Sequence, residues 1–163
     1  MGSLRMAEID RLKEIVEKLR SENGCPWDRA QTHESLKAPV IEEAAEVVCG
    51  INILEETKDP DNLKEELGDL LLQVMFHAVI AEEEGLFTFD DVVKGISEKM
   101  VRRHPHVFGG VTYASEEEMH EAWNKIKKEE KAGKEWHEEY LPAAFQEATQ
   151  LIRKAEERKK KKN

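Results

Sequence analysis

Apolar residues recur at helical spacing along most of this 163-residue chain, and the apolar/polar alternation of β-strands is nearly absent. Charged residues make up 37% of the sequence and are mostly Lys and Glu, while aromatic residues make up only 6%. A chain of this length can bury a core of its own as one domain. These features predict an all-α fold, a helical bundle of about five to six helices.

Glycine, proline and capping residues divide the chain into expected helices. In chain order these helices cover about residues 7–22, 33–55, 62–84, 89–103, 116–131 and 141–157. We expect Pro39 to break or bend the second helix, because its ring cannot continue the interior hydrogen bonds. Gly24 is expected to cap the first helix, and Ser115 with Glu118 predicts a capping box for the fifth.

Two groups of acidic residues interrupt stretches that are otherwise apolar, VIEEAAEVV and LKEELGDLLLQV. At about 100° per residue, the first group falls within an arc of roughly 100° on one helix. That group is Glu42, Glu43 and Glu46. Cys49 and Ile53 continue the same arc, so we expect these acids to share a face with core residues.

The second acidic group lies on the next expected helix. Glu66 and Asp69 are three residues apart and therefore neighbours, and Gln73 and Ile80 continue their stripe. If the two acidic faces oppose each other, they gather four or five carboxylates into a carboxylate-lined site.

The energy of such a cluster separates two interpretations. On an exposed helix face, a pair of like charges costs only about 0.2–0.5 kcal/mol, so a solvated acidic patch is one alternative. In a half-buried groove of effective dielectric ~20, two carboxylates ~5 Å apart repel by roughly 3 kcal/mol. A buried cluster therefore needs cations or protons. All-oxygen ligands without thiolates or paired histidines favour Mg²⁺ or Mn²⁺.

Basic and aromatic residues at four-residue spacing indicate a second cluster. Lys99 and Arg103 point to the same side of one helix, and Arg103 also follows its apolar stripe. A guanidinium on an inward face usually meets an anion, with an ordinary pairing to a glutamate as the alternative. Trp123 and Lys127 repeat this spacing, although such a pair alone is more typical of surface packing.

Charge and cysteine usage exclude several classes of protein. A net charge of -10 argues against general nucleic-acid binding, which requires a basic surface. No apolar run reaches the ~18 residues of a membrane span. Cys25 and Cys49 lack CxxC spacing, which favours a protein of the reducing cytosol. The basic tail from Arg158 to Lys162 is expected to be a solvated end.

The expected third helix suggests an assembly. From Leu70 to Ala81 it is apolar nearly all round, which predicts burial on every side. We therefore expect a homo-oligomer, most simply a two-fold dimer. The alternative is a monomer whose other helices wrap this helix completely.

The order of these motifs resembles a known enzyme family. EEAAE at 42–46 and ELGD at 66–69 are similar to the ExxE…ExxD pattern of the all-α nucleoside triphosphate pyrophosphohydrolases. More narrowly, GCPWDRAQTHESL, EELGDLLLQVMFHA, FTFDDVV and KMVRRHPHVFGG resemble MazG. The resemblance covers about residues 9–130.

The resemblance implies a metal-dependent hydrolase of nucleoside triphosphates. Family members cleave NTPs or dNTPs between the α- and β-phosphates to the monophosphate and pyrophosphate. Mg²⁺ is the implied cofactor, with Mn²⁺ as a substitute. The resemblance also implies a broad base preference, an intertwined dimer or larger assembly, and a role in nucleotide-pool housekeeping or stress.

The resemblance also assigns roles to individual residues. The implied metal ligands are Glu43, Glu46, Glu66 and Asp69, with Glu42 binding metal or orienting water. The implied substrate-binding residues are Lys99 and Arg103 on the triphosphate, Arg102 as a helper, and Trp123 and Lys127 near the nucleotide.

The implied domain division places a MazG-like module at residues 1–133 and a C-terminal helix with a basic tail at 134–163. LPAAFQEATQLIRKAEE resembles the join to a second module, but no second acidic motif follows it. The chain is therefore expected to be a natural single-module form or a shortened chain.

Two rival functions keep part of this pattern. A non-catalytic helical dimerisation or regulatory module would keep the helices without needing the carboxylates. A phosphoribosyl-ATP or dUTP pyrophosphohydrolase would keep the acids but differ in its base-contacting loops. GCPWD and RRHPHVF favour MazG over both.

Overall fold

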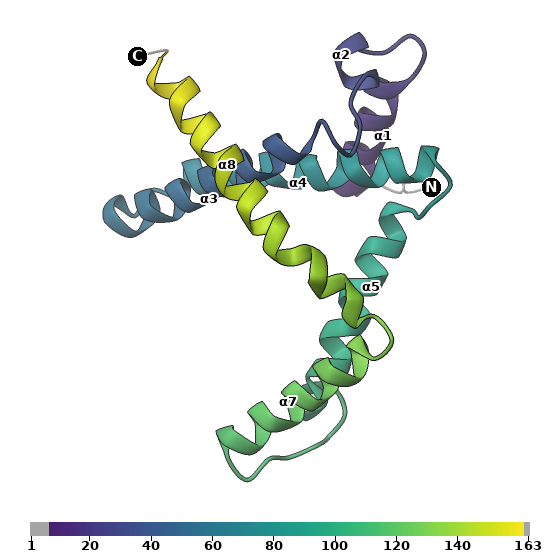
Figure 1. Ribbon diagram of the computed structural model, residues 1–163, viewed down its shortest axis with the longest axis vertical. Helices are drawn as coiled ribbons and strands as arrows, with labels where there is room; N and C mark the ends of the chain where they lie inside the picture. Colours follow the sequence, from purple (N-terminus) through teal and green to yellow (C-terminus); the bar gives the residue numbers. More distant parts are fainter. Residues whose placement is uncertain (1–6, 162–163) are drawn as a thin grey trace, which may run out of the picture. The chain divides into compact units, whose positions relative to one another are not determined.

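The computed structural model describes residues 7–161, and every regular element within that range is helical (Figure 1). The elements are α1 Glu8–Arg20, α2 Pro26–Arg29, α3 Lys37–Thr57, α4 Asp61–Glu83, α5 Phe89–Arg103, α6 Pro105–Phe108, α7 Glu116–Lys131, the 3₁₀ helix η1 Glu135–Tyr140 and α8 Leu141–Lys160. The predicted all-α class is confirmed. In this described part of the chain, no helix combines the length and apolarity needed to cross a bilayer.

The predicted helix boundaries are most accurate where capping residues are strong. The helices predicted at 89–103 and 116–131 coincide with α5 and α7. The second predicted helix begins about four residues too early, because residues 33–36 form a turn and α3 starts at Lys37. Pro39 is the third residue of α3, where the backbone N–H lacks a helical partner in any case. Its ring therefore leaves the helix unbroken.

Two predicted caps have opposite outcomes. Ser115 caps α7 as predicted, with its hydroxyl accepting from the Glu118 N–H at 3.2 Å. The prediction for Gly24 is wrong, since α1 already ends at Arg20. Gly24 instead lies against the helix end, where an added Cβ would be 2.3 Å from the Leu19 carbonyl oxygen.

The described chain divides into two compact units. The first contains residues 7–89 and 147–161, and the second contains residues 90–146. In the first unit, α3 and α4 lie side by side and share its largest helix–helix contact, while α1 packs against α4 (Figure 1). Lys58, at φ 61°, turns the chain between α3 and α4.

A close approach of backbones holds α3 against α4. Gly50 of α3 is buried, and a Cβ built there would lie 2.8 Å from the Cα of Leu63 and 3.2 Å from Oδ1 of Asn62. Such distances are too short for any side chain larger than hydrogen. Glycine at this position therefore lets the first turns of α4 lie close to α3.

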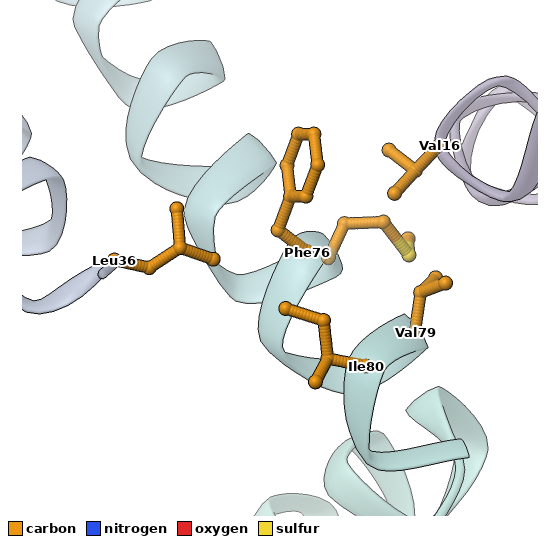
Figure 2. Close-up of a cluster of buried hydrophobic side chains, with 6 residues drawn as sticks. Val16, Leu36, Phe76, Val79 and Ile80 are labelled. Atoms are coloured by element: carbon orange, nitrogen blue, oxygen red, sulfur yellow. The ribbon is translucent and has the colours of Figure 1, made fainter. Parts of the chain in front are cut away.

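The core of the first unit gathers around the second half of α4 (Figure 2). Val16 of α1 reaches α4 on one side and Leu36, just before α3, reaches it on the other. The buried cluster consists of Val16, Leu36, Met75, Phe76, Val79 and Ile80. Gln73 and Ile80, which continue the predicted acidic stripe, are both buried.

The stretch of α4 from Leu70 to Ala81, which was predicted to be buried on every side, is only partly covered. Leu67, Leu71 and Val74 follow one helical stripe, with 50%, 39% and 40% of their surface exposed. The monomer alternative requires the other helices to wrap this helix completely, and the structure does not show such wrapping. These residues leave an apolar strip on α4 open.

The second unit has no buried residue among positions 90–146. Its helices α5 and α7 are joined through ion pairs of Arg102 and Arg103 with Glu130. Several large apolar side chains of α5 are exposed, among them Ile96 and Met100. The helices of the second unit are thus joined by ion pairs, and the unit has no buried core of its own.

Candidate functional site

Three of the predicted carboxylates meet between α3 and α4. Ligand oxygens of Glu43, Glu46 and Glu66 all lie within 4.8 Å of one another. Hard divalent cations bind oxygen at about 2.0–2.6 Å, so oxygens around one ion are at most about 4–5 Å apart. The trio therefore has the spacing that one such ion requires.

Burial and mutual repulsion act on the central acid of this trio. The pKa of Glu43 is raised, first by its burial and then by the negative charges of Glu46, Asp69 and Glu66. Both effects disfavour the ionised form of Glu43. A cation at the cluster would reverse this balance by stabilising the carboxylates.

One oxygen of Glu66 lacks a hydrogen-bond partner. Its Oε1 accepts from the Asn62 side chain at 3.0 Å, whereas its Oε2 is buried without a donor. Oδ1 of Asn62 is buried and unpartnered as well. Buried carboxylate oxygens normally have a donor or a cation, so the orphaned oxygens fit a metal ion.

Asn62 is a site residue that the sequence interpretation missed. It lies four positions before Glu66 and therefore on the same face of α4. This spacing was visible in the sequence, but Asn62 is also the last residue of DPDN, a segment typical of a turn.

The remaining predicted acids lie outside the trio. Asp69 is exposed, although its charge contributes to the raised pKa of Glu43. Glu42 pairs with Arg158. Cys49, which was expected on a core face, is exposed and lines a cavity beside the acids.

The cavity beside the acids has a volume of about 400 Å³ and lies between α3, α4 and α8. The last turns of α8 contribute two ion pairs, Arg158 with Glu42 and Lys159 with Glu46. The basic tail was predicted to be a solvated end, and for these two residues that prediction is wrong. Their side chains remain 55% and 62% exposed, but both form ion pairs with acidic residues of α3.

The predicted basic residues gather in the second unit. Arg102 donates through Nε to one oxygen of Glu130 at 2.8 Å, and Arg103 donates through two nitrogens to the other oxygen at 3.0 and 2.6 Å. The pairing of Arg103 with a glutamate, the alternative raised by its spacing, is thus present. Lys99 has no ion pair with any residue that the structure describes.

Trp123 connects the cations of α5 and α7. Nζ of Lys127 lies 4.4 Å from the centre of the indole ring, and the guanidinium carbon of Arg103 lies 5.7 Å from it. Both distances are within the range of cation–π contacts. Three of the predicted substrate-binding residues therefore form one cluster around an aromatic ring.

Residues 31–108 match the profile of the MazG nucleotide pyrophosphohydrolase domain. This stretch is a MazG domain. The matched stretch includes the acid trio and also Lys99, Arg102 and Arg103. Trp123, Lys127 and α8 lie beyond it.

Three curated relatives support this domain assignment. The chain is 51% identical over 129 residues to the nucleoside triphosphate pyrophosphohydrolase/pyrophosphatase MazG of Thermotoga maritima, which aligns 77% of this chain and 46% of the relative. It is 46% identical over 133 residues to the nucleoside triphosphate pyrophosphohydrolase of Escherichia coli K12, with 81% of this chain and 49% of the relative aligned. It is 53% identical over 124 residues to the Bacillus subtilis protein YabN, with 76% and 24% aligned.

The alignments also set the extent of the similarity. The chain spans about half of the length of the Thermotoga and Escherichia relatives and about a quarter of YabN. The acids of α3 and α4 lie inside the domain that defines the MazG family.

Proposed function

We propose that this MazG chain hydrolyses nucleoside triphosphates between the α- and β-phosphates, releasing a nucleoside monophosphate and pyrophosphate. The observation that carries the proposal is the trio of Glu43, Glu46 and Glu66 with the unpartnered Oε2 of Glu66. The MazG domain match and the names of the Thermotoga and Escherichia relatives support the reaction class.

The carboxylates of α3 and α4 are the proposed metal ligands. Glu43, Glu46 and Glu66 would hold Mg²⁺, or Mn²⁺ in its place, and Asp69 on the next turn of α4 is the proposed fourth ligand. When bound, the ion supplies charge neutralisation of the phosphates and lowers the pKa of a coordinated water.

Proton transfer is assigned to the acid cluster as a whole. A carboxylate within hydrogen-bond reach of the attacking water can accept its proton as the oxygen bonds to phosphorus. The charges of Glu46, Asp69 and Glu66 all act on Glu43, so the acceptor of the proton is assigned to the group and not to one carboxylate. Glu42, next in sequence, is the proposed residue that orients this water.

The cations of α5 and α7 are the proposed phosphate-binding residues. Lys99, Arg103 and Lys127 would stabilise the charge that develops on the pyrophosphate leaving group, with Arg102 as a helper. Glu130 already holds both arginines, so a phosphate must compete with this carboxylate for them. Trp123 would place an aromatic face beside the nucleotide.

We propose that the working form is a homo-oligomer, most simply a two-fold dimer. The second unit has no buried residue, and α4 exposes the strip formed by Leu67, Leu71 and Val74. Burying apolar surface stabilises an assembly by roughly 25 cal/mol per Å². A dimer in which each copy covers such surfaces of the other would therefore be favoured.

Release of pyrophosphate from the eight common NTPs and dNTPs, with Mg²⁺ and with EDTA, tests the proposed reaction. The wild-type protein should give monophosphate and pyrophosphate only with the metal. Glu66→Ala should lose this activity, and the neighbouring exposed Glu65→Ala should keep it. Release of inorganic phosphate, or metal-independent turnover, would contradict the proposal. A folded, metal-binding protein without turnover would favour the non-catalytic alternative.

A further inference from the structure

A second cavity lies entirely within the unit formed by residues 90–146. It has a volume of about 370 Å³, which is at the small end of the ~300–1,000 Å³ range of ligand pockets. Its walls include Arg103, His104, His106, Tyr113, His120 and Trp123. The proposed metal site and its acids contribute nothing to this cavity, because they belong to the other unit.

Planar side chains dominate the walls of this cavity. The ring of His106 contacts those of His104 and Tyr113, with ring centres 5.7 and 5.8 Å away and tilts of 51° and 56°. On α7, the ring of His120 lies 6.5 Å from that of Trp123. Such rings offer π-faces and edges to a flat ligand, and nucleobases commonly stack on aromatic side chains in other proteins.

The polar groups of the cavity are neutral or basic. No carboxylate is among its lining residues. A neutral imidazole offers one donor and one acceptor, and a phenol offers both through one oxygen. His104 Nδ1 lies 2.6 Å from the Met100 carbonyl oxygen, which can only accept, so Nδ1 donates and Nε2 of a neutral ring is left as an acceptor.

Arg103 connects the cavity to the proposed phosphate-binding residues. It lines the cavity wall, pairs with Glu130, and lies against the same indole ring as Lys127. Because Arg103 and Trp123 line the histidine-lined cavity, a ligand with its phosphates at Arg103 and Lys127 would lie beside it.

We propose that this cavity binds the nucleobase of the substrate, with His106, Tyr113 and His120 as the residues that determine base preference. The proposal rests on the proposed function, since it assigns one part of a nucleoside triphosphate to the cavity. A flat heterocycle with several donors and acceptors fits walls of rings that carry both, and a carboxylate-free lining suits the nucleoside of an anionic ligand.

Calorimetric titration of the full chain in EDTA measures this binding without any hydrolysis. The probes are ATP, GTP, CTP and UTP, with inorganic triphosphate as the base-free control. The nucleotides should bind at least about fivefold more tightly than inorganic triphosphate, since only they offer a base to stack. At least one pair of nucleotides should also differ in affinity, because the rings offer directional hydrogen bonds.

Variants separate the base from the phosphates. His106→Ala and His120→Ala should reduce the advantage of nucleotides over inorganic triphosphate by about fivefold or more, without changing triphosphate binding. Tyr113→Phe, which keeps the ring and removes only the hydroxyl, should alter the order of preference among the four bases. His137→Ala is the matched control, since His137 is exposed on η1 outside the cavity.

The outcomes for base binding and for hydrolysis are distinguishable. Equal binding of nucleotides and inorganic triphosphate, or unchanged nucleotide binding in His106→Ala and His120→Ala, would overturn the base-binding proposal even if the protein hydrolyses NTPs. Base-dependent binding that these variants abolish would support it even if no pyrophosphate is released, in which case only the proposed reaction fails.

Discussion

At the scale of single residues, Gly50 determines how closely α3 and α4 approach. A methyl group at this position would meet the backbone of Leu63, which cannot move as a flexible side chain could. Because Asn62 is part of this contact and Glu66 lies one turn after it on α4, the site depends on it. The acids could be recognised from the sequence, but the contact that brings the two helices together could not.

Gly50→Ala should therefore destabilise the protein by roughly 1–3 kcal/mol, as overpacking of a buried contact does. The control is Gly95→Ala in α5, where an added Cβ meets nothing within 4 Å. That change should be neutral or stabilise by about 0.5–1 kcal/mol through the helix propensity of alanine. Urea unfolding of both variants measures the difference, and equal stabilities would contradict the close approach.

We expect a histidine pair to make the stability of the protein depend on pH. Nδ1 of His33 and Nδ1 of His77 are 2.7 Å apart, so one ring must donate and the other accept. The pKa of His77 is lowered from its ordinary value of 6.5, first by burial and then by the charge of His33. Glu84 lies 3.7 Å from Nε2 of His33 and is the carboxylate that faces the pair.

The sign of this effect follows from the lowered pKa. The folded protein keeps His77 neutral, whereas the unfolded chain takes up a proton below about pH 6.5. Stability should thus be complete above about pH 6.5 and should fall as the pH drops towards the lower folded pKa. Free energies of unfolding at about pH 7.5 and about pH 5.5 should show a smaller loss in His77→Asn than in the wild type. His137→Ala should retain the wild-type loss, and an unchanged slope in His77→Asn would refute this assignment.

At the scale of helices, prediction from the sequence succeeded where local signals were strong. Ser115 and Glu118 define the start of α7, and Pro105 forbids α5 from continuing past Arg103, so both helices were predicted to the residue. The short helices α2 and α6 were missed because four-residue elements carry no apolar period. The pairing of α8 with α3 joins residues more than a hundred positions apart, and nothing local indicates it.

The contact of α8 with α3 should weaken metal binding. Lys159 pairs with Glu46, a proposed ligand, so a metal ion must compete with its ammonium group. Because the pair is largely exposed, Lys159→Ala should raise the affinity for Mn²⁺ only about two- to fivefold. Lys160→Ala is the matched control, since Lys160 pairs with Glu156 of its own helix. Electron paramagnetic resonance of free Mn²⁺ measures both, and equal affinities would contradict the competition.

At the scale of the whole molecule, the main feature is apolar surface that the residues of one chain do not cover. The sequence correctly predicted an apolar α4, and its second half is buried by α1 and by Leu36. The strip formed by Leu67, Leu71 and Val74 remains open. Periodicity identifies an apolar face but not the surface that covers it, so the dimer stays a prediction.

Sedimentation of the full chain tests the dimer. The wild type should sediment with twice the mass of one chain, and Val74→Glu should shift the mass towards one chain by placing a charge on the strip. Trp27→Glu, a change at a side chain that is 80% exposed on α2, should leave the mass unchanged. A wild-type mass of one chain at all concentrations would contradict the predicted assembly.

The central claim is that the acids of α3 and α4 bind the metal on which hydrolysis depends. Binding of Mn²⁺ measured by electron paramagnetic resonance, in parallel with pyrophosphate release from ATP, tests it most directly. In Glu66→Gln both metal binding and pyrophosphate release should be lost together, while Glu65→Gln should keep both. Pyrophosphate release that persists in Glu66→Gln after Mn²⁺ binding has been lost would contradict the account.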